Sequence, residues 1–585
     1  MTYKHTIIMK KYKNIYLVLT FLISGSMCFT SCEDTLKEDP NSYYTRKDFF
    51  TSVSNAEMAI NGIYNILLTL YGDNDGQCTI ASDDIIYPAG GAGKDNTRRD
   101  MGHYMLTTSN KLIESLWNGK YEQLNRANYC IQNIEDMKGY SQNNDLQRLV
   151  ATAKFFRAQA AFDLVRYWGD VPFKTYYSSS YEDAYQPRTP REKIYEQIIE
   201  DLNIAKTILP WADAGTSPEK VSQGVVRALL MRVLLTRAGY SLQMGGSLER
   251  PEDDIRKTYF DAVIDEWEAF QKNGYHGFYD GGYEALFKSF SKGILNSKES
   301  LFEIAFYYPG AKGTWGTYMG PAVTAPNVST GDAGKYMGRA NATFRAVPEW
   351  KSFYETKTEI VEENGKKVEK ETLVDKRRDV VICTYQYIWD DKTMSHIQKE
   401  DNSGRNWYPG KWRREWMPAG STKDLNSTDI NYCLFRYADV VLMAAEAYNE
   451  IGETSQAWIL LNKIRERAGA TQVHTLAEYR QVQPNLYDLP YFNDGDEKDE
   501  FRTALYWERG LELAFEGQRK YDLIRWGILA EALQLFSRNT VANSDNSEIY
   551  IAADNFRTGQ HELFPIPIDE IQVNYKLNGK NNPGY

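Results

Sequence analysis

The sequence is poor in the residues on which most catalytic and metal centres depend. Its 585 residues include only six histidines and six cysteines, and neither a GxSxG nor an HExxH motif occurs. The cysteines show no CxxC spacing, so they indicate neither a zinc site nor a disulfide framework. We expect Cys78, Cys130, Cys383 and Cys433 to be small buried hydrophobic residues. We therefore predict a protein without catalytic residues, bound metal or cofactor.

The chain also lacks an excess of basic residues. It holds 68 Lys and Arg against 79 Asp and Glu, which gives a formal net charge of −11 at pH 7. A protein that binds nucleic acid needs a basic face to neutralise phosphates. The acidic balance therefore argues against a nucleic-acid partner, and it suits a surface that faces water.

The N-terminal 31 residues have the pattern of an export signal. Residues 1–14 carry four lysines and no acid, and residues 15–29 form an apolar run that is too short for a membrane helix of ~20 residues. A basic head, an apolar middle and small residues before a cut are typical of a secretory signal peptide. Because the small pair Thr30-Ser31 precedes Cys32, we predict a lipoprotein signal peptide at 1–31 and a lipid anchor on Cys32. The alternative is an ordinary signal peptide with incidental cysteines.

Residues 32–45 have the composition of a solvated, lipidated tether. The acidic stretch EDTLKEDP follows Cys32 and ends at Pro40, which disfavours helix. Removal of residues 1–31, which hold four lysines and no acid, lowers the formal net charge from −11 to −15. No Pro-, Ser- or Gly-rich linker divides the remaining chain, so we predict a single body at 46–585.

Helical periodicity dominates this body on both sides of a long irregular segment. The expected helices are 51–70, 112–137, 146–168, 190–209, 222–238, 435–451, 454–468 and 501–535. Between them lie short helices at 258–273 and 347–355, and an Asn-Gly pair at 364–365 favours a hairpin. We predict a helical scaffold at 46–240 and 432–585, and an irregular, ligand-facing insertion at 241–431.

Several helices pair like the units of a helix–turn–helix solenoid. In MAAEAYNEIGETSQAWILLNKIRERAG, the small residues Ala444 and Ala447 allow close helix approach, Gly452 makes the turn, and Ala457 sits at the next crossing. Two earlier helix pairs have similarly short connections. The predicted fold is therefore all-α, with tetratricopeptide-like stacked helix pairs, a long irregular loop-rich insertion and little β-structure.

Five blocks, in this order, resemble the recurring blocks of the SusD/RagB family. They are WNGKYEQLNRANYCIQNIE (117–135), ATAKFFRAQAAFDLVRYWGDVPF (151–173), FRYADVVLMAAEAYNEIG (435–452), ALYWERGLELAFEGQRKYDLIRWG (504–527) and LFPIPIDEIQVNYKLNGKNNPGY (563–585). The resemblance runs from Cys32 to Tyr585. It implies a helical, tetratricopeptide-like fold and attachment to the bacterial outer membrane, facing the cell exterior. It also implies pairing with a SusC-like TonB-dependent transporter and capture of an oligosaccharide or polysaccharide for delivery to it.

Charged residues recur at helical spacing in the fourth block. Glu508, Glu512 and Glu516 alternate with arginines at i, i+3 and i+4 steps, which favours helix. As a hydrolase site, Glu508 and Glu512 would form a catalytic carboxylate pair. Carboxylates paired with arginine stay ionised and make poor general acids, so we interpret this cluster as scaffold. Trp117 and Trp168 lie in the other blocks and are expected in the core.

Sugar recognition needs open aromatic faces together with a few convergent polar groups. The family places such aromatics on loops at positions that vary, so the candidates come from local chemistry in residues 71–104 and 307–350. In the second stretch, glycines flank the aromatics and are expected to leave ring faces open. The predicted ligand-binding residues are Tyr87, Trp315 and Tyr318 as platforms, and Asp73, Asn74 and Arg98 as polar partners.

Two further clusters have two interpretations each. In NWYPGKWRREWMP (406–418), three tryptophans interleave with Lys411, Arg413 and Arg414. They form either internal cation–π stacks or a face for an acidic glycan. A calcium ion held by Asp73, Asp75, Asp83 or Asp84 is an alternative use of the first stretch, although EF-hand spacing is absent.

Two other functions remain open at this point. One is a lid subunit of the transporter that has negligible ligand affinity of its own. The other is a surface glycoside hydrolase, because the two carboxylates of such an enzyme can lie far apart in sequence.

Overall fold

The computed structural model describes residues 49–74, 82–88, 96–363, 366–420, 424–539 and 551–585. The predicted leader and the Cys32 anchor lie outside these residues. Residues Ala56–Tyr585 form one compact unit. None of the helices in the described ranges is long and apolar enough to cross a membrane.

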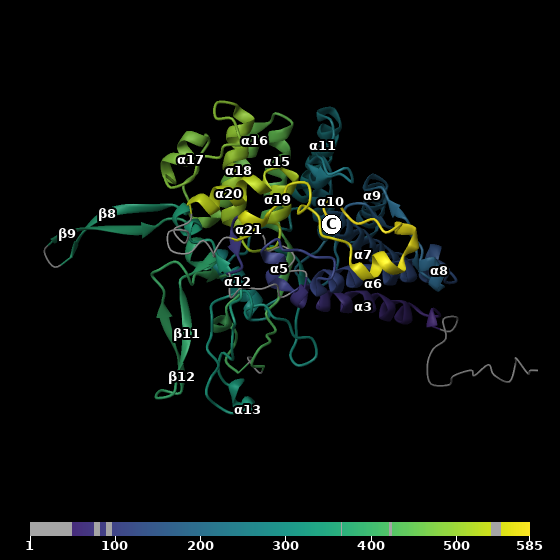
Figure 1. The fold of residues 1–585 in the computed structure, drawn as a ribbon, viewed down its shortest axis with the longest axis horizontal. Coiled ribbons are helices and arrows are strands. Elements are labelled where there is room, and N and C mark those ends of the chain that lie inside the picture. Colours follow the sequence, from purple (N-terminus) through teal and green to yellow (C-terminus); the bar gives the residue numbers. More distant parts are fainter. Residues whose placement is uncertain (1–48, 75–81, 89–95, 364–365, 421–423, 540–550) are drawn as a thin grey trace, which may run out of the picture. The chain divides into compact units, whose positions relative to one another are not determined.

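The N-terminal half of the scaffold is a run of antiparallel helices. Its elements are α3 (Val53–Thr69), α6 (Lys111–Glu135), α7 (Asn144–Trp168), α9 (Arg191–Ile208), α10 (Gln223–Ala238) and α11 (Asp253–Asn273). Helix α6 packs on α7, α7 on α9, α9 on α10, and α10 on α11 (Figure 1). Asn110 and Asn143 cap α6 and α7, because each side chain accepts backbone N–H groups of the first turn. Trp117 and Trp168 are buried as predicted, edge to face at 5.0 Å.

The helices of the C-terminal half of the scaffold also pack against one another. Its main helices are α15 (Tyr437–Glu450), α16 (Thr454–Ala468), α18 (Glu497–Leu513), α19 (Arg519–Arg525) and α20 (Leu529–Asn539). Helix α15 packs against α16, α18 and α11. The predicted close crossing is confirmed, because Ala444, Ala447 and Ala457 are completely buried, and Gly452 takes a φ of 93° in the turn.

The prediction of a single helix at 501–535 is wrong. The structure has three helices there, α18, α19 and α20. Phe515 and Gly517 have φ values of 68° and 81°, which break the helix after Leu513, and Gly527 (φ 74°) breaks it again. The Phe515 backbone N–H donates to the Asp84 carboxylate at 3.0 Å, so a distant segment stabilises the first break.

The segment 241–431 is mostly irregular, as predicted, but it contains a full helix near its start. The helix expected at 258–273 starts at Asp253 and packs against α10 and α15, so the scaffold extends to Asn273. The helix expected at 347–355 is the 3₁₀ segment Pro348–Phe353. The remaining α-helices of the segment 241–431 are short: α12 (Gly282–Ser291), α13 (Thr330–Ala333) and α14 (Arg378–Val381).

Strands are short and paired two by two among the described residues. The predicted Asn-Gly hairpin is confirmed as β8 (Thr356–Glu363) and β9 (Lys366–Leu373), which extend away from the helices (Figure 1). A second hairpin, β11 (Tyr385–Asp390) with β12 (Ser395–Glu400), was not expected. The other pairs are β1 (Ile85–Ile86) with β7 (Arg345–Ala346), β2 (Val171–Pro172) with β3 (Arg188–Thr189), β4 (Ser241–Leu242) with β5 (Leu248–Glu249), β6 (Ser300–Ile304) with β14 (Tyr432–Arg436), and β10 (Ile382–Cys383) with β13 (Tyr408–Pro409).

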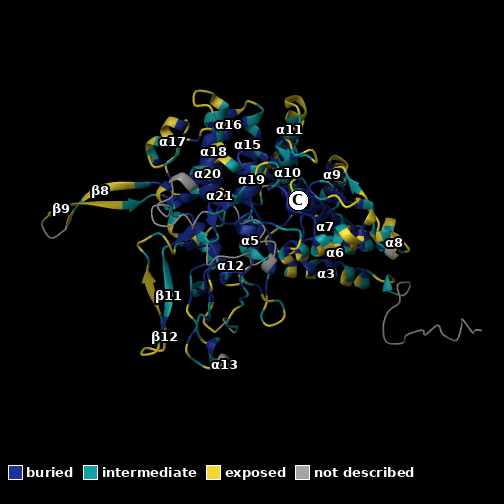
Figure 2. Ribbon diagram, viewed as in Figure 1, coloured by how far each residue is buried: buried dark blue, intermediate teal, exposed yellow. Residues whose placement is uncertain are grey.

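The core follows the helices of both halves. Figure 2 shows buried residues along α7, α10, α15 and α18, with exposed residues concentrated on β8, β9 and the loop ends. Cys130, Cys383 and Cys433 are free and buried, as predicted, whereas Cys78 lies outside the described residues. Burial raises the pKa of the Cys130 thiol to about 12, so it is an inert hydrophobic side chain.

Candidate functional site

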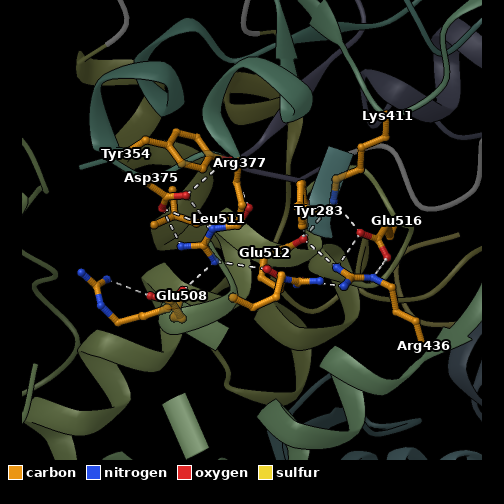
Figure 3. Close-up of polar contacts among 12 residues, drawn as sticks. Tyr283, Tyr354, Asp375, Arg377, Lys411, Arg436, Glu508, Leu511, Glu512 and Glu516 are labelled. Carbon is orange, nitrogen blue, oxygen red and sulfur yellow. Dashed lines mark hydrogen bonds and ion pairs between the residues drawn. The ribbon is translucent and has the colours of Figure 1, made fainter. Parts of the chain in front are cut away.

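The charged cluster of α18 is buried inside the protein. Glu508 accepts a hydrogen bond from Arg377 at 2.6 Å (Figure 3). It also accepts hydrogen bonds from Arg465 at 3.1 Å and from the Tyr479 hydroxyl at 3.0 Å. Its side chain has no exposed surface. Three partners and complete burial leave this carboxylate no access to a substrate.

Glu512 is held in the same way. It pairs with Arg377 at 3.2 Å and also with Arg436 and Arg467. Burial alone would raise the pKa of Glu512, but Arg467, Arg436 and Arg377 together lower it well below its usual value. A permanently ionised and enclosed carboxylate cannot act as a general acid, which agrees with its interpretation as scaffold.

Two of the four acidic residues considered as calcium ligands have hydrogen-bond partners within the protein. Asp83 accepts two hydrogen bonds of 2.8 Å from Arg519, and Asp84 accepts from Ser82 at 2.6 Å. Both carboxylates therefore point into the protein. Within the described residues no group of three or more His, Cys, Asp or Glu side chains could hold a metal ion. Asp75 and the side chain of Asp73 lie outside what the structure describes.

The two stretches that were predicted to carry the site lie side by side. The Gly72 carbonyl accepts from the Thr314 backbone N–H at 3.0 Å and from the Thr314 hydroxyl at 2.8 Å. Asp73 and Asn74 follow directly, in a π-helical turn at Leu70–Asn74. Their backbone is thus placed beside residue 314, and nothing further is defined for their side chains.

Trp315 does not present an open ring face in this structure. Only 5% of it is exposed, and it stacks on Tyr432 at 4.4 Å with an interplanar angle of 4°. Trp412 lies at 4.7 Å, and the indole N–H donates to the Tyr71 carbonyl at 2.9 Å. The expectation that its neighbouring glycines would free the ring is wrong.

The glycines around Trp315 serve close packing instead. A Cβ on Gly316 would lie 2.7 Å from Ile430, and one on Gly320 would lie 2.2 Å from the Trp412 carbonyl oxygen. These positions take positive φ values of 78° and 127°. The glycines therefore let backbone and side chains close over Trp315, which makes it a buried support for the loops.

Three other predicted residues are connected through contacts of Tyr318 and Phe344. The Arg98 guanidinium, on α5 (Arg98–Gly102), lies 4.1 Å from the centroid of the Tyr318 ring. The Phe344 backbone N–H donates to the Tyr318 carbonyl at 3.4 Å, and Tyr87 meets the Phe344 ring edge to face at 5.6 Å. Tyr87, Arg98 and Tyr318 are all half-buried, so each retains an accessible surface.

One exposed aromatic residue was not among the predicted platforms. Tyr307 is 70% exposed at a tight turn, where its backbone exchanges two hydrogen bonds of 2.6 Å with Ala311. Its neighbour Tyr308 lies 6.0 Å from the ammonium of Lys312, which pairs with Asp424 at 2.5 Å. The sequence signal was the Tyr-Tyr-Pro-Gly run, because Pro-Gly places the preceding rings at a loop tip. We use the name loop face for Tyr87, Arg98, Tyr307 and Tyr318, the accessible residues of the two predicted stretches at 71–104 and 307–350.

The basic and aromatic cluster at 406–418 is mainly internal. Lys411, Trp412 and Arg414 are at most 2% exposed, and Lys411 pairs with Glu516 at 2.5 Å. The expectation of an acidic-glycan face is therefore wrong for these residues. The internal stacking is confirmed by the Arg413 guanidinium, which lies 4.6 Å from the centroid of the Trp416 ring. Trp407 differs, because it lines a hollow of about 220 Å³ with Lys351 at 4.9 Å from its ring.

Comparison with known proteins agrees with this architecture. The sequence model described as "SusD family" matches residues 298–585, and the one described as "Starch-binding associating with outer membrane" matches residues 38–235. SusD-like protein P25 of Formosa agariphila is 27% identical over 98% of this chain and 100% of its own length. The chain belongs to the SusD/RagB family.

Solved structures share the fold. A SusD homolog from Bacteroides thetaiotaomicron superposes with a TM-score of 0.73 at 25% identity, covering 92% of this chain and 98% of the homolog. A protein named as a laminarin-binding SusD-like protein gives a TM-score of 0.62 at 20% identity, covering 92% of this chain and all of the other. The all-α, tetratricopeptide-like fold is thereby established for this chain.

Proposed function

We propose that this protein is a cell-surface lipoprotein that captures oligosaccharide and delivers it to a SusC-like TonB-dependent transporter. It is anchored through Cys32 in the outer membrane and faces the cell exterior. Residues 46–585 act as one body, in which the helices form the scaffold and the insertion carries the ligand site. Catalysis is not part of this function, since Glu508 and Glu512, the carboxylates considered as a catalytic pair, are buried and held by arginines.

The observation that carries the proposal is the loop face. It combines the exposed ring of Tyr307 with the Arg98–Tyr318 stack and the half-buried Tyr87. Aromatic rings suit the C–H faces of a pyranose, and a guanidinium suits its hydroxyl or carboxylate groups. Asp73 and Asn74 are proposed as further polar partners because their backbone adjoins Thr314. Trp315 is proposed to act from beneath, as the support on which these loops are held.

Affinity electrophoresis and calorimetry against a panel of polysaccharides, laminarin included, test this proposal. Tyr307→Ala and Tyr318→Ala are expected to weaken retention by about tenfold each, which corresponds to about 1.4 kcal/mol. Tyr575→Ala is the matched control, since Tyr575 is 68% exposed and lies on the C-terminal segment Tyr575–Leu577. Equal retention of all three variants would contradict the loop face.

The two alternative functions, a lid subunit without ligand affinity and a glycoside hydrolase, would give different results in the same assays. A lid subunit without ligand affinity would show no retention on any polysaccharide, while its loss would still impair uptake. A hydrolase would release oligosaccharides on prolonged incubation, and a carboxylate variant would abolish the release. Copurification of the lipidated protein with a large outer-membrane β-barrel tests the transporter pairing.

A further inference from the structure

A second pocket lies on the helical scaffold, among elements that do not contribute to the loop face. Its volume is about 320 Å³, and it is formed by α6, by the chain after β2, by α8 (Tyr181–Ala184) and by α22 (Ile568–Val573). Helix α6 supplies Trp117, Tyr121 and Asn125 at i, i+4 and i+8, which brings them onto one helix face. This volume is at the lower end of the range of small-molecule sites, about 300–1,000 Å³.

Three aromatic residues, Trp117, Tyr121 and Phe173, line part of the pocket. Trp117 lies edge to face against the core residue Trp168 at 5.0 Å and meets Tyr121 at 4.7 Å. The Tyr121 hydroxyl donates to the Pro172 carbonyl at 2.8 Å, which fixes its ring in place. The rings are thus held rigidly by the scaffold, so the apolar surface exists before any ligand arrives.

Some of the polar side chains that line the pocket keep unused hydrogen-bonding groups. Within the described residues, no hydrogen bond is made by the indole N–H of Trp117, although this side chain is only 3% exposed. The side-chain amide of Asn118 also makes none. Asn125 uses its oxygen for the Ser178 backbone N–H at 2.8 Å, and Gln186 uses its N–H₂ for the Asp183 carbonyl at 3.2 Å. Donors from Trp117 and Asn125 and an acceptor from Gln186 are left for a ligand.

The charged groups at the rim have internal partners. Glu122 pairs with Arg126 at 2.5 Å, Lys174 donates to the Asp183 carbonyl at 2.6 Å, and Glu570 accepts from Asn574 at 2.9 Å. Two carboxylates against one ammonium disfavour an anionic ligand. Rings beside neutral donors and acceptors suit a neutral molecule with one apolar face and several hydroxyl groups.

We propose that this pocket is a second saccharide site, which binds one neutral pyranose end of a glycan. Trp117 and Tyr121 line the apolar side of the sugar. Asn118, Asn125, Gln186 and the Trp117 indole bind its hydroxyl groups. The pocket goes beyond the loop face of the proposed function, because it is built on rigid helices and recognises a terminus instead of a chain.

Indole N–H spectra of the protein labelled with ¹⁵N-tryptophan test the proposal, with the methyl glycosides of glucose, galactose and mannose as probes. One glycoside is expected to shift a single indole signal, which is absent from the Trp117→Phe variant. The surface variants Asn118→Ala and Gln186→Ala leave the core intact, and together they are expected to weaken the titration by about tenfold or more. Methyl glucuronide is expected to bind more weakly than the neutral glycosides.

Tyr307→Ala is the control at the loop face. It is expected to leave the Trp117 titration unchanged while weakening polysaccharide retention, so failure of either site is recognised separately. The pocket proposal is overturned if no glycoside moves the Trp117 signal at the highest soluble concentration. It is also overturned if Asn118→Ala and Gln186→Ala together leave the titration unchanged.

Discussion

The guanidinium of Arg98 lies over the ring of Tyr318, 4.1 Å from its centroid. The two residues come from the two separate stretches that were predicted to carry the site. Arg98 lies on α5, and Tyr318 lies in the glycine-rich part of the insertion. Their contact therefore joins two segments that only the fold brings together. It also orients the tyrosine ring and places a cation beside it, which is the arrangement that the loop face needs.

The Arg98–Tyr318 contact is expected to contribute a coupling of about 0.5–1 kcal/mol to the free energy of unfolding. A double-mutant cycle of Arg98→Ala and Tyr318→Ala, followed by urea denaturation, measures it. The pair Arg98→Ala and Tyr575→Ala serves as control and is expected to be additive. A coupling near zero for the first pair would show that the stack has no energetic role.

The buried pair Asp83–Arg519 ties the segment before β1 to α19. Arg519 contacts both carboxylate oxygens at 2.8 Å, and Asp83 is fully buried. Asp83→Asn is expected to destabilise the protein by about 3–5 kcal/mol, because it leaves the Arg519 charge buried without its partner. The shift of the urea midpoint measures this loss.

The control for Asp83→Asn is the same change at an exposed ion pair. Asp280 lies 2.5 Å from Lys298, with the two side chains 84% and 37% exposed. Asp280→Asn is expected to cost less than about 1 kcal/mol, since solvent screens such pairs. Similar losses for both variants would mean that burial does not govern the Asp83 pair.

The buried carboxyl group of Glu303 is expected to make the folded protein less stable as the pH rises. Burial raises the pKa of its carboxyl to about 7, although Asn431 donates to it at 3.0 Å. The folded protein therefore retains a proton that the unfolded chain has released above pH ~4.5. This contribution is fully present below pH ~4.5 and is lost progressively up to about pH 7.

Glu303→Gln isolates this effect, since it keeps the shape and removes the titration. The variant is expected to match the parent protein near pH 4 and to be more stable at pH 8, by on the order of 3 kcal/mol. Thermal unfolding of both proteins across this range gives the difference. A difference that does not change with pH would contradict the raised pKa.

Two helical glycines are expected to respond in opposite ways to alanine. At Gly510 in α18, an added Cβ would lie 2.2 Å from the ring of Trp350. The clash is expected to outweigh a helix-propensity gain of about 1 kcal/mol and to destabilise the protein. Gly62→Ala in α3 is the matched control, because its nearest atom is Arg126 Nη1 at 3.8 Å, and it is expected to stabilise. Thermal unfolding compares the two variants.

Local sequence patterns were sufficient to predict most helices of the scaffold. A 3.6-residue apolar period predicted α6, α7, α9, α10 and α16 to within a few residues, because each helix buries one face of its own. The Asn-Gly hairpin followed from turn chemistry in the same way. The break of α18 from α19 could not be predicted, since Asp84, far away in the chain, accepts the Phe515 N–H that stabilises it.

The sequence by itself determined the helical class and the family, because these depend on residue type and spacing, and it predicted the two stretches that we propose for the site. Only the tertiary structure decided which aromatic rings are open. Trp315 and Tyr307 stand in equally glycine-rich surroundings, yet Tyr432 and Trp412 cover the first while the second is 70% exposed. Exposure of a ring depends on what other segments pack against it, and contacts between distant segments are not encoded in local spacing.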